Sequence, residues 1–97
     1  MDNKICDILR NYRISDMEMR DMLSQAPMLE MVSFQEFVNN CKVLVQYGYP
    51  KSDLDFLFLA NPNMFVLSRE DLEKELIGLK EKYSDVEMVL KNNPTII

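Results

Sequence analysis

The chain has 97 residues, of which 47% are hydrophobic, and this length suffices for one domain with a buried core. It contains no histidine, which excludes catalytic triads that need this residue and removes the commonest general base, metal ligand and pH switch. The 16 acidic residues outnumber the 11 basic ones, and the resulting net charge of −5 disfavours tight binding to nucleic acid.

Two helices are expected in the first part of the chain. Residues 1–14 predict an N-terminal helix, because apolar side chains recur on one helical face. That face consists of Ile5, Ile8, Leu9 and Tyr12. Ser15 offers a cap for the next helix, which Pro27 ends. Its predicted apolar side consists of Met19, Met22, Leu23 and Ala26.

The most regular helical pattern lies between Ser33 and Gly48. Ser33 and Glu36 match a capping box, in which each side chain satisfies a free backbone amide of the other residue. Gly48 suits the left-handed conformation that often ends a helix, and Pro50 prevents the helix from continuing. The predicted core face of this helix consists of Phe34, Phe37, Val38, Cys41, Leu44 and Val45.

The stretch 48–83 is interpreted as one helix-turn-helix unit. Ser52 and Asp53 are candidate caps for a short helix, which must stop before Pro62. The segment 64–67 is too apolar for a surface loop, so we expect it to lie buried. Ser68 then caps a second helix. The predicted core stripe of this helix consists of Leu72, Leu76, Leu79 and Tyr83.

Parts of this unit recur on both sides of it, aligned on three prolines. Pro27, Pro62 and Pro94 have spacings of 35 residues (27 to 62) and 32 residues (62 to 94). Apolar residues recur at fixed distances before each proline. Met19, Leu54 and Val86 stand eight positions before it, Met22, Leu57 and Val89 five positions before it, and Leu23, Phe58 and Leu90 four positions before it. Such a period is typical of solenoids, whose units bury their apolar faces against neighbours.

We therefore expect an all-α, solenoid-like array of about six helices in one domain. Its predicted parts are an N-terminal helix (1–14), repeat 1 (15–48), repeat 2 (49–83) and a half repeat (84–97). Ile96 and Ile97 align with the residues after Pro62 that are expected to be buried. The tail is therefore expected to pack inward, and the alternative is an exposed contact for another chain.

No residue constellation indicates catalysis, a cofactor or a metal site. Cys6 and Cys41 lack the spacing of a zinc site, and Cys41 is expected to be a buried reduced thiol while Cys6 is partly exposed. Asp53 and Asp55 open a helix, and the acidic run 70–75 is interpreted as a solvated face. The two isolated glycines do not form a phosphate-binding loop. We expect a protein that is not an enzyme.

Two neighbouring stretches of the chain carry a family resemblance. They are Tyr47-Gly48-Tyr49-Pro50-Lys51-Ser52-Asp53-Leu54 and Ala60-Asn61-Pro62-Asn63-Met64-Phe65. Together they resemble a repeat of the mitochondrial transcription termination factor (mTERF) family. The resemblance covers residues 15–97. It implies a superhelical stack of units with two helices and a short 3₁₀ turn. In that family such stacks present a basic groove to nucleic acid and regulate organellar transcription or translation.

The sequence leaves two hypotheses for the function of the protein. The first is a small module that binds a protein partner or a second copy of itself, which the acidic balance favours. The second is a nucleic-acid-binding regulator as the resemblance implies, with Lys74, Lys80 and Lys82 as candidate contacts. The chain has no apolar run long enough to span a membrane and no secretory or organelle-targeting signature, so a cytoplasmic location is expected.

Overall fold

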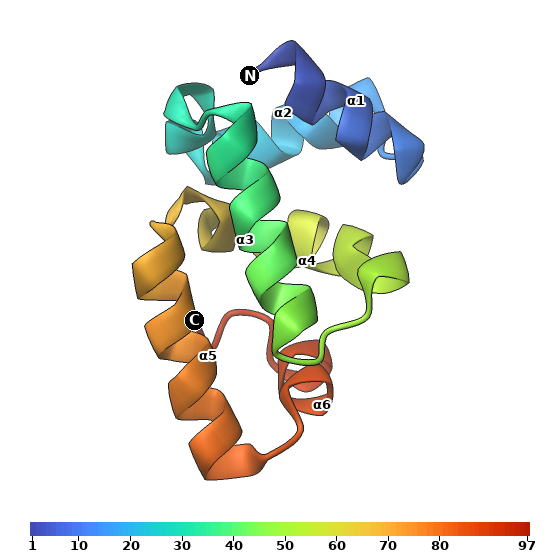
Figure 1. Cartoon of the computed structure of the whole chain (residues 1–97). Helices are drawn as coiled ribbons and strands as arrows, with labels where there is room; N and C mark the ends of the chain where they lie inside the picture. Colours follow the sequence, from blue (N-terminus) through green and yellow to red (C-terminus); the bar gives the residue numbers. More distant parts are fainter.

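The computed structural model describes all 97 residues and contains six α-helices, three 3₁₀-helices and no strand (Figure 1). The α-helices are α1 (Asn3–Asn11), α2 (Asp16–Gln25), α3 (Phe34–Gln46), α4 (Leu54–Ala60), α5 (Arg69–Tyr83) and α6 (Val86–Asn92). The 3₁₀-helices are η1 (Pro27–Met31), η2 (Lys51–Asp53) and η3 (Pro62–Val66). The prediction of an all-α chain with about six helices is confirmed. None of the helices combines the length and the apolar character needed to cross a membrane.

The helices form two groups that share one core. α1 packs against α3, and α3 lies beside α5 (Figure 1). In the other group α2 contacts α4, and η1 contacts η3. α6 folds back against α5. The core lies where α3 meets α4 and η3.

Capping side chains begin three of the six α-helices at the predicted residues. The hydroxyl oxygens of Ser15 and Ser33 each accept from a backbone amide at 3.1 Å and complete capping boxes with the glutamates three residues later. Ser68 caps α5 in the same way at 3.1 Å. Asp53 occupies the N-cap position of α4 as predicted, but its side chain forms no capping hydrogen bond and instead accepts from the Nζ of Lys91 on α6, at 2.6 Å.

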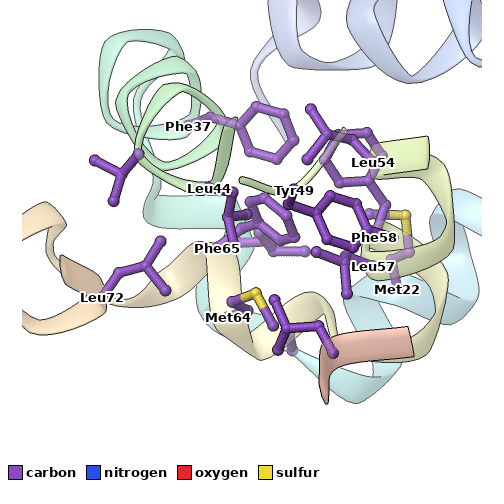
Figure 2. Packing of buried hydrophobic residues seen from close by; sticks show 14 of the residues in the cluster. Met22, Phe37, Leu44, Tyr49, Leu54, Leu57, Phe58, Met64, Phe65 and Leu72 are labelled. Carbon is purple, nitrogen blue, oxygen red and sulfur yellow. The ribbon is translucent and has the colours of Figure 1, made fainter. Parts of the chain in front are cut away.

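Three phenylalanines from three different helices form the centre of the core (Figure 2). Phe37 of α3, Phe58 of α4 and Phe65 of η3 are at most 1% exposed, and their ring centroids lie 4.9–5.3 Å apart. Aromatic pairs at such distances contribute about 0.5–1.5 kcal/mol beyond the burial of their area. Met64 and Phe65 are buried, as predicted for residues 64–67, whereas Val66 and Leu67 are only half-buried.

The buried face of α3 is rotated relative to the prediction. Phe37 and Leu44 are fully buried as expected, but Asn40 and Val43 are buried beside them. The Nδ2 of Asn40 donates to the carbonyl oxygen of Leu67 at 2.8 Å, just before α5 begins. α5 therefore covers this flank of α3. The opposite flank contains the predicted core residues that are only half-buried or exposed, namely Phe34, Val38, Cys41 and Val45.

The predicted core residues of α5 are buried except for the last one. Leu72, Leu76 and Leu79 are buried, whereas Tyr83 is 41% exposed. Tyr83 is the last residue of α5, and this end of the helix extends beyond the end of α3 (Figure 1). The prediction that Tyr83 belongs to the core was wrong.

The C-terminal tail packs against the core, as expected. Ile96 and Ile97 are half-buried among core residues. The Nδ2 of Asn61, itself only 8% exposed, donates to the carbonyl oxygen of Pro94 at 2.9 Å. Lys91 adds a second connection, because the hydrogen bonds of its Nζ to Asp53 and Glu87 join α6 to the residue before α4. These bonds raise the pKa of Lys91 and lower that of Asp53.

Gly48 and Gly78 lead to opposite predictions for alanine substitution. Gly48 follows α3 with φ at 104°, a conformation that L side chains rarely adopt, while Gly78 lies inside α5. A Cβ would meet no atom within 4 Å at either position, so only the backbone decides the outcome. Gly78→Ala should stabilise the fold by about 1 kcal/mol, and Gly48→Ala should destabilise it by about 1–2 kcal/mol. Urea denaturation measures both, and shifts of the same sign would contradict the assignment.

Candidate functional site

A groove of about 570 Å³ lies between α1, α3 and the segment that runs from η2 into α4. Six of its lining residues are hydrophobic: Ile8, Tyr12, Val38, Cys41, Val45 and Leu54. Three of these belong to the flank of α3 that was predicted to lie in the core. The groove thus exposes part of the apolar stripe that made this helix conspicuous in the sequence.

The groove exists because α3 is only partly covered on this side. α1 has 9 residues and α3 has 13, so α1 cannot cover the whole flank. The chain turns away after α1 at Arg13, whose φ of 65° is in the left-handed region. Val45, near the C-terminal end of α3, remains 40% exposed. A partly uncovered apolar wall is the result.

Tyr12 connects two sides of the groove. Its hydroxyl donates to the carbonyl oxygen of Lys51 at 2.7 Å, which joins α1 to η2. Its ring meets the ring of Phe58 edge-on, with the centroids 5.4 Å apart. Burial raises the pKa of Tyr12, and the neighbouring Cys41 and Asp55 raise it further. Tyr12 therefore stays protonated at neutral pH and serves as a hydrogen-bond donor in this wall.

Two lysines and one asparagine supply the polar lining of the groove. Lys42 on α3 and Lys51 on η2 are exposed, and neither has a carboxylate within 4.0 Å. Asn11 is the remaining polar residue. No carboxylate lines the groove, although acidic residues outnumber basic ones in the chain. The local charge is therefore opposite in sign to the net charge of the protein.

Cys41 lies in the wall of the groove, which corrects its predicted place in the core. Its side chain is half-buried, and burial raises the pKa of its thiol to about 12. A thiol with such a pKa is almost fully protonated at neutral pH and is a poor nucleophile and metal ligand. Cys6 is also half-buried and free. No group of three or more cysteine, aspartate or glutamate side chains is placed to hold a metal ion.

The reactivity of Cys41 gives a direct test of this environment. At about pH 8 a thiol reagent is expected to modify Cys41 at least tenfold more slowly than a cysteine of ordinary pKa, since the thiolate is the reacting form. Mass spectrometry of time points locates the label on Cys6 or Cys41. Both cysteines should react at similar rates in urea. Rapid labelling of Cys41 in the native protein would contradict its placement in the apolar wall.

The structure does not bring Lys74, Lys80 and Lys82 together into one basic face. All three are exposed on α5. At about 100° per residue, Lys80 points about 120° away from Lys74 and about 160° away from Lys82 around the helix. Exposed acidic residues occupy the same helix at positions 70, 71, 75 and 81. Their arrangement therefore does not concentrate positive charge.

Methionines form the other unusual surface feature. Met17, Met28, Met31 and Met88 are 69%, 58%, 76% and 51% exposed. Met28 and Met31 are three residues apart in η1, so the 3₁₀ geometry places them on the same side of that helix.

Comparisons with known proteins found no match to a protein-family model, a curated protein or a solved structure. The resemblance to the mTERF family therefore rests on the residues of the chain itself. Sequence reasoning did not find the groove, because Lys42 and Lys51 are separated by a helix end and a turn. The available signal was the width of the apolar stripe on α3, which exceeds what one neighbouring helix can cover.

Proposed function

We propose that the chain is a small helical-repeat module that is not an enzyme and that binds another protein. The contacts between helices at equivalent positions of the proposed units support the repeat. α1 packs against α3 and α3 against α5, while α2 packs against α4 and η1 against η3. In solenoids, equivalent elements of successive units stack in this way and bury their apolar faces between units.

The burial of equivalent positions also supports the repeat. Residues at the same distance before the three prolines are buried in nearly every case, with Leu23 half-buried. The buried positions are Met19, Leu54 and Val86; Met22, Leu57 and Val89; Phe58 and Leu90. This agrees with a mTERF-like unit of two helices and a 3₁₀ turn, as the resemblance implies.

The turns that end α1 and α3 have the same backbone hydrogen bonds, which supports adding α1 to the proposed repeat. The backbone amide of Ile14 donates to Leu9 at 3.0 Å, and that of Tyr49 donates to Leu44 at 3.0 Å. These are the bonds of a Schellman motif, and both turns contain a residue with positive φ. Each pair is 35 residues apart (9 to 44 and 14 to 49), which equals the spacing of the first two prolines. We therefore include α1 in a first unit that consists of α1, α2 and η1.

The ionisable groups of the groove favour binding over catalysis. A nucleophile or general base needs a pKa near the working pH or a neighbouring group that activates it. The pKa values of Tyr12 and Cys41 are instead raised by burial, which keeps both groups protonated. The groove therefore offers contact surface and hydrogen-bond donors.

The observation that favours a protein partner is the exposed pair Met28 and Met31 on η1. Two large apolar side chains with 58% and 76% exposure lie on one side of a short helix whose other side contacts η3. Methionine is flexible and polarizable and is frequent on surfaces that bind proteins. At the corresponding positions of η3 the chain has polar Asn63 and half-buried Val66. The exposed methionine pair is therefore particular to η1.

The double variant Met28→Gln/Met31→Gln tests this proposal, with Met88→Gln as the matched control. Met88 is exposed on α6, at the opposite end of the molecule from η1 (Figure 1). Light scattering over a range of concentrations measures self-association, and affinity capture from the source cells measures binding of another protein. We expect the double variant to lose the association and Met88→Gln to retain it. Association that is equal in all three proteins, or absent in wild type, would overturn the proposal.

The second candidate function is nucleic-acid binding, which the resemblance favours and the net charge of −5 opposes. Fluorescence anisotropy with labelled duplex and single strands measures it. We expect no binding tighter than tens of micromolar even at low salt, because affinity for nucleic acid comes mainly from phosphate neutralisation. A submicromolar, salt-sensitive signal that disappears when Lys74, Lys80 and Lys82 are changed to alanine would favour the family's function instead.

A further inference from the structure

We propose that the groove between α1, α3 and η2 binds a small anionic amphiphile, namely a carboxylate attached to a single unbranched hydrocarbon chain. The groove is distinct from the pair Met28 and Met31, so this inference does not depend on the proposed function. Its volume of about 570 Å³ is within the range of about 300–1,000 Å³ that is typical of small-molecule sites. Such sites combine a mostly apolar lining with a few polar groups that orient the ligand.

The apolar part of the ligand would lie along α3. Val38, Cys41 and Val45 follow one another at helical spacing and line the groove, with Ile8 and Tyr12 contributed by α1. Cys41 itself is half-buried, whereas Val45 farther along the wall is 40% exposed. A hydrocarbon chain in this position would remove the exposed apolar flank of α3 from water.

The charge of the ligand follows from the lysines. Lys42 and Lys51 line the same groove from different elements, and neither forms an ion pair. Asp55, which raises the pKa of Tyr12, is not among the lining residues. In contrast, Lys91 is held by two carboxylates. Two free ammonium groups beside an apolar wall complement an anionic head and repel a cationic one.

A titration with dodecanoate below its critical micelle concentration tests the site. The amide shifts of the ¹⁵N-labelled full chain report where the compound binds, and isothermal titration calorimetry reports how tightly. We expect shift changes around the groove and saturable binding. Dodecyltrimethylammonium, which has the same chain and the opposite charge, should bind at least about tenfold more weakly.

Charge-reversal variants separate this site from nonspecific adsorption. Lys42→Glu/Lys51→Glu should weaken the binding of dodecanoate at least about tenfold. Lys74→Glu/Lys80→Glu makes the same change in net charge on α5 and should leave the affinity unchanged. None of these four lysines forms an ion pair, so all variants should fold, and circular dichroism melts verify this.

Several results would overturn the proposal. These are no saturable binding of dodecanoate, equal affinity for the two amphiphiles, equal loss in the two double variants, or shift changes centred on Met28 and Met31. Concentration-dependent dimerisation that Lys42→Glu/Lys51→Glu abolishes, without carboxylate binding, would show that a second copy of the chain occupies the groove. Val45→Glu, which places a carboxylate on an exposed part of the wall, should weaken dodecanoate binding if the proposal is correct.

Discussion

Replacing Phe58 with alanine is expected to lower the free energy of unfolding by about 3–5 kcal/mol. Phe58 is fully buried, and its ring centroid lies 5.3 Å from that of Phe37, 4.9 Å from that of Phe65 and 5.4 Å from that of Tyr12. Phe58 therefore joins α3, α4, η3 and the residue that follows α1. Total stabilities of small domains are about 5–15 kcal/mol, so the variant should be severely destabilised or unfolded.

Phe56→Ala is the matched control, because it removes the same atoms from the same helix. Phe56 is 40% exposed, and its loss should cost about 1 kcal/mol or less. Urea denaturation followed by circular dichroism compares the two variants with wild type. Equal destabilisation by both substitutions would show that α4 presents a different face to the core.

Leu76→Ala should cost about 2–5 kcal/mol, the range observed for buried leucines. Leu76 is fully buried in the middle of α5, which packs against both α3 and α6. Its removal would leave a cavity where α5 contacts α3 and α6. The decrease in the free energy of unfolding therefore measures how much the packing of α5 contributes to the stability of the fold.

Ile77 provides the control for this second substitution. It follows Leu76 directly, but it is 41% exposed because it faces away from the buried stripe. Ile77→Ala should change the stability by about 1 kcal/mol or less. If Leu76→Ala proves nearly neutral in the same urea experiment, then α5 does not contribute its leucine stripe to the core.

The sequence alone was sufficient to predict the helix starts and ends that depend only on neighbouring residues in the chain. The start of α3 follows from Ser33 and Glu36, whose capping box needs only four consecutive residues. The ends of α2 and α4 follow from Pro27 and Pro62, because proline restricts the residue before it. The end of α3 follows from Gly48 and its left-handed backbone. These interactions are the same in any fold that contains the segments.

Features that depend on which elements become neighbours required the tertiary structure. The periodicity of α3 marked Cys41 and Val45 as core residues, but α5 covers the flank of Asn40 and Val43 and leaves the other flank to the groove. Asp53 had the local sequence of a cap, yet Lys91 is 38 residues away and binds its carboxylate. Helical periodicity shows that a face is apolar, whereas the lengths and positions of the neighbouring helices decide how much of that face is buried.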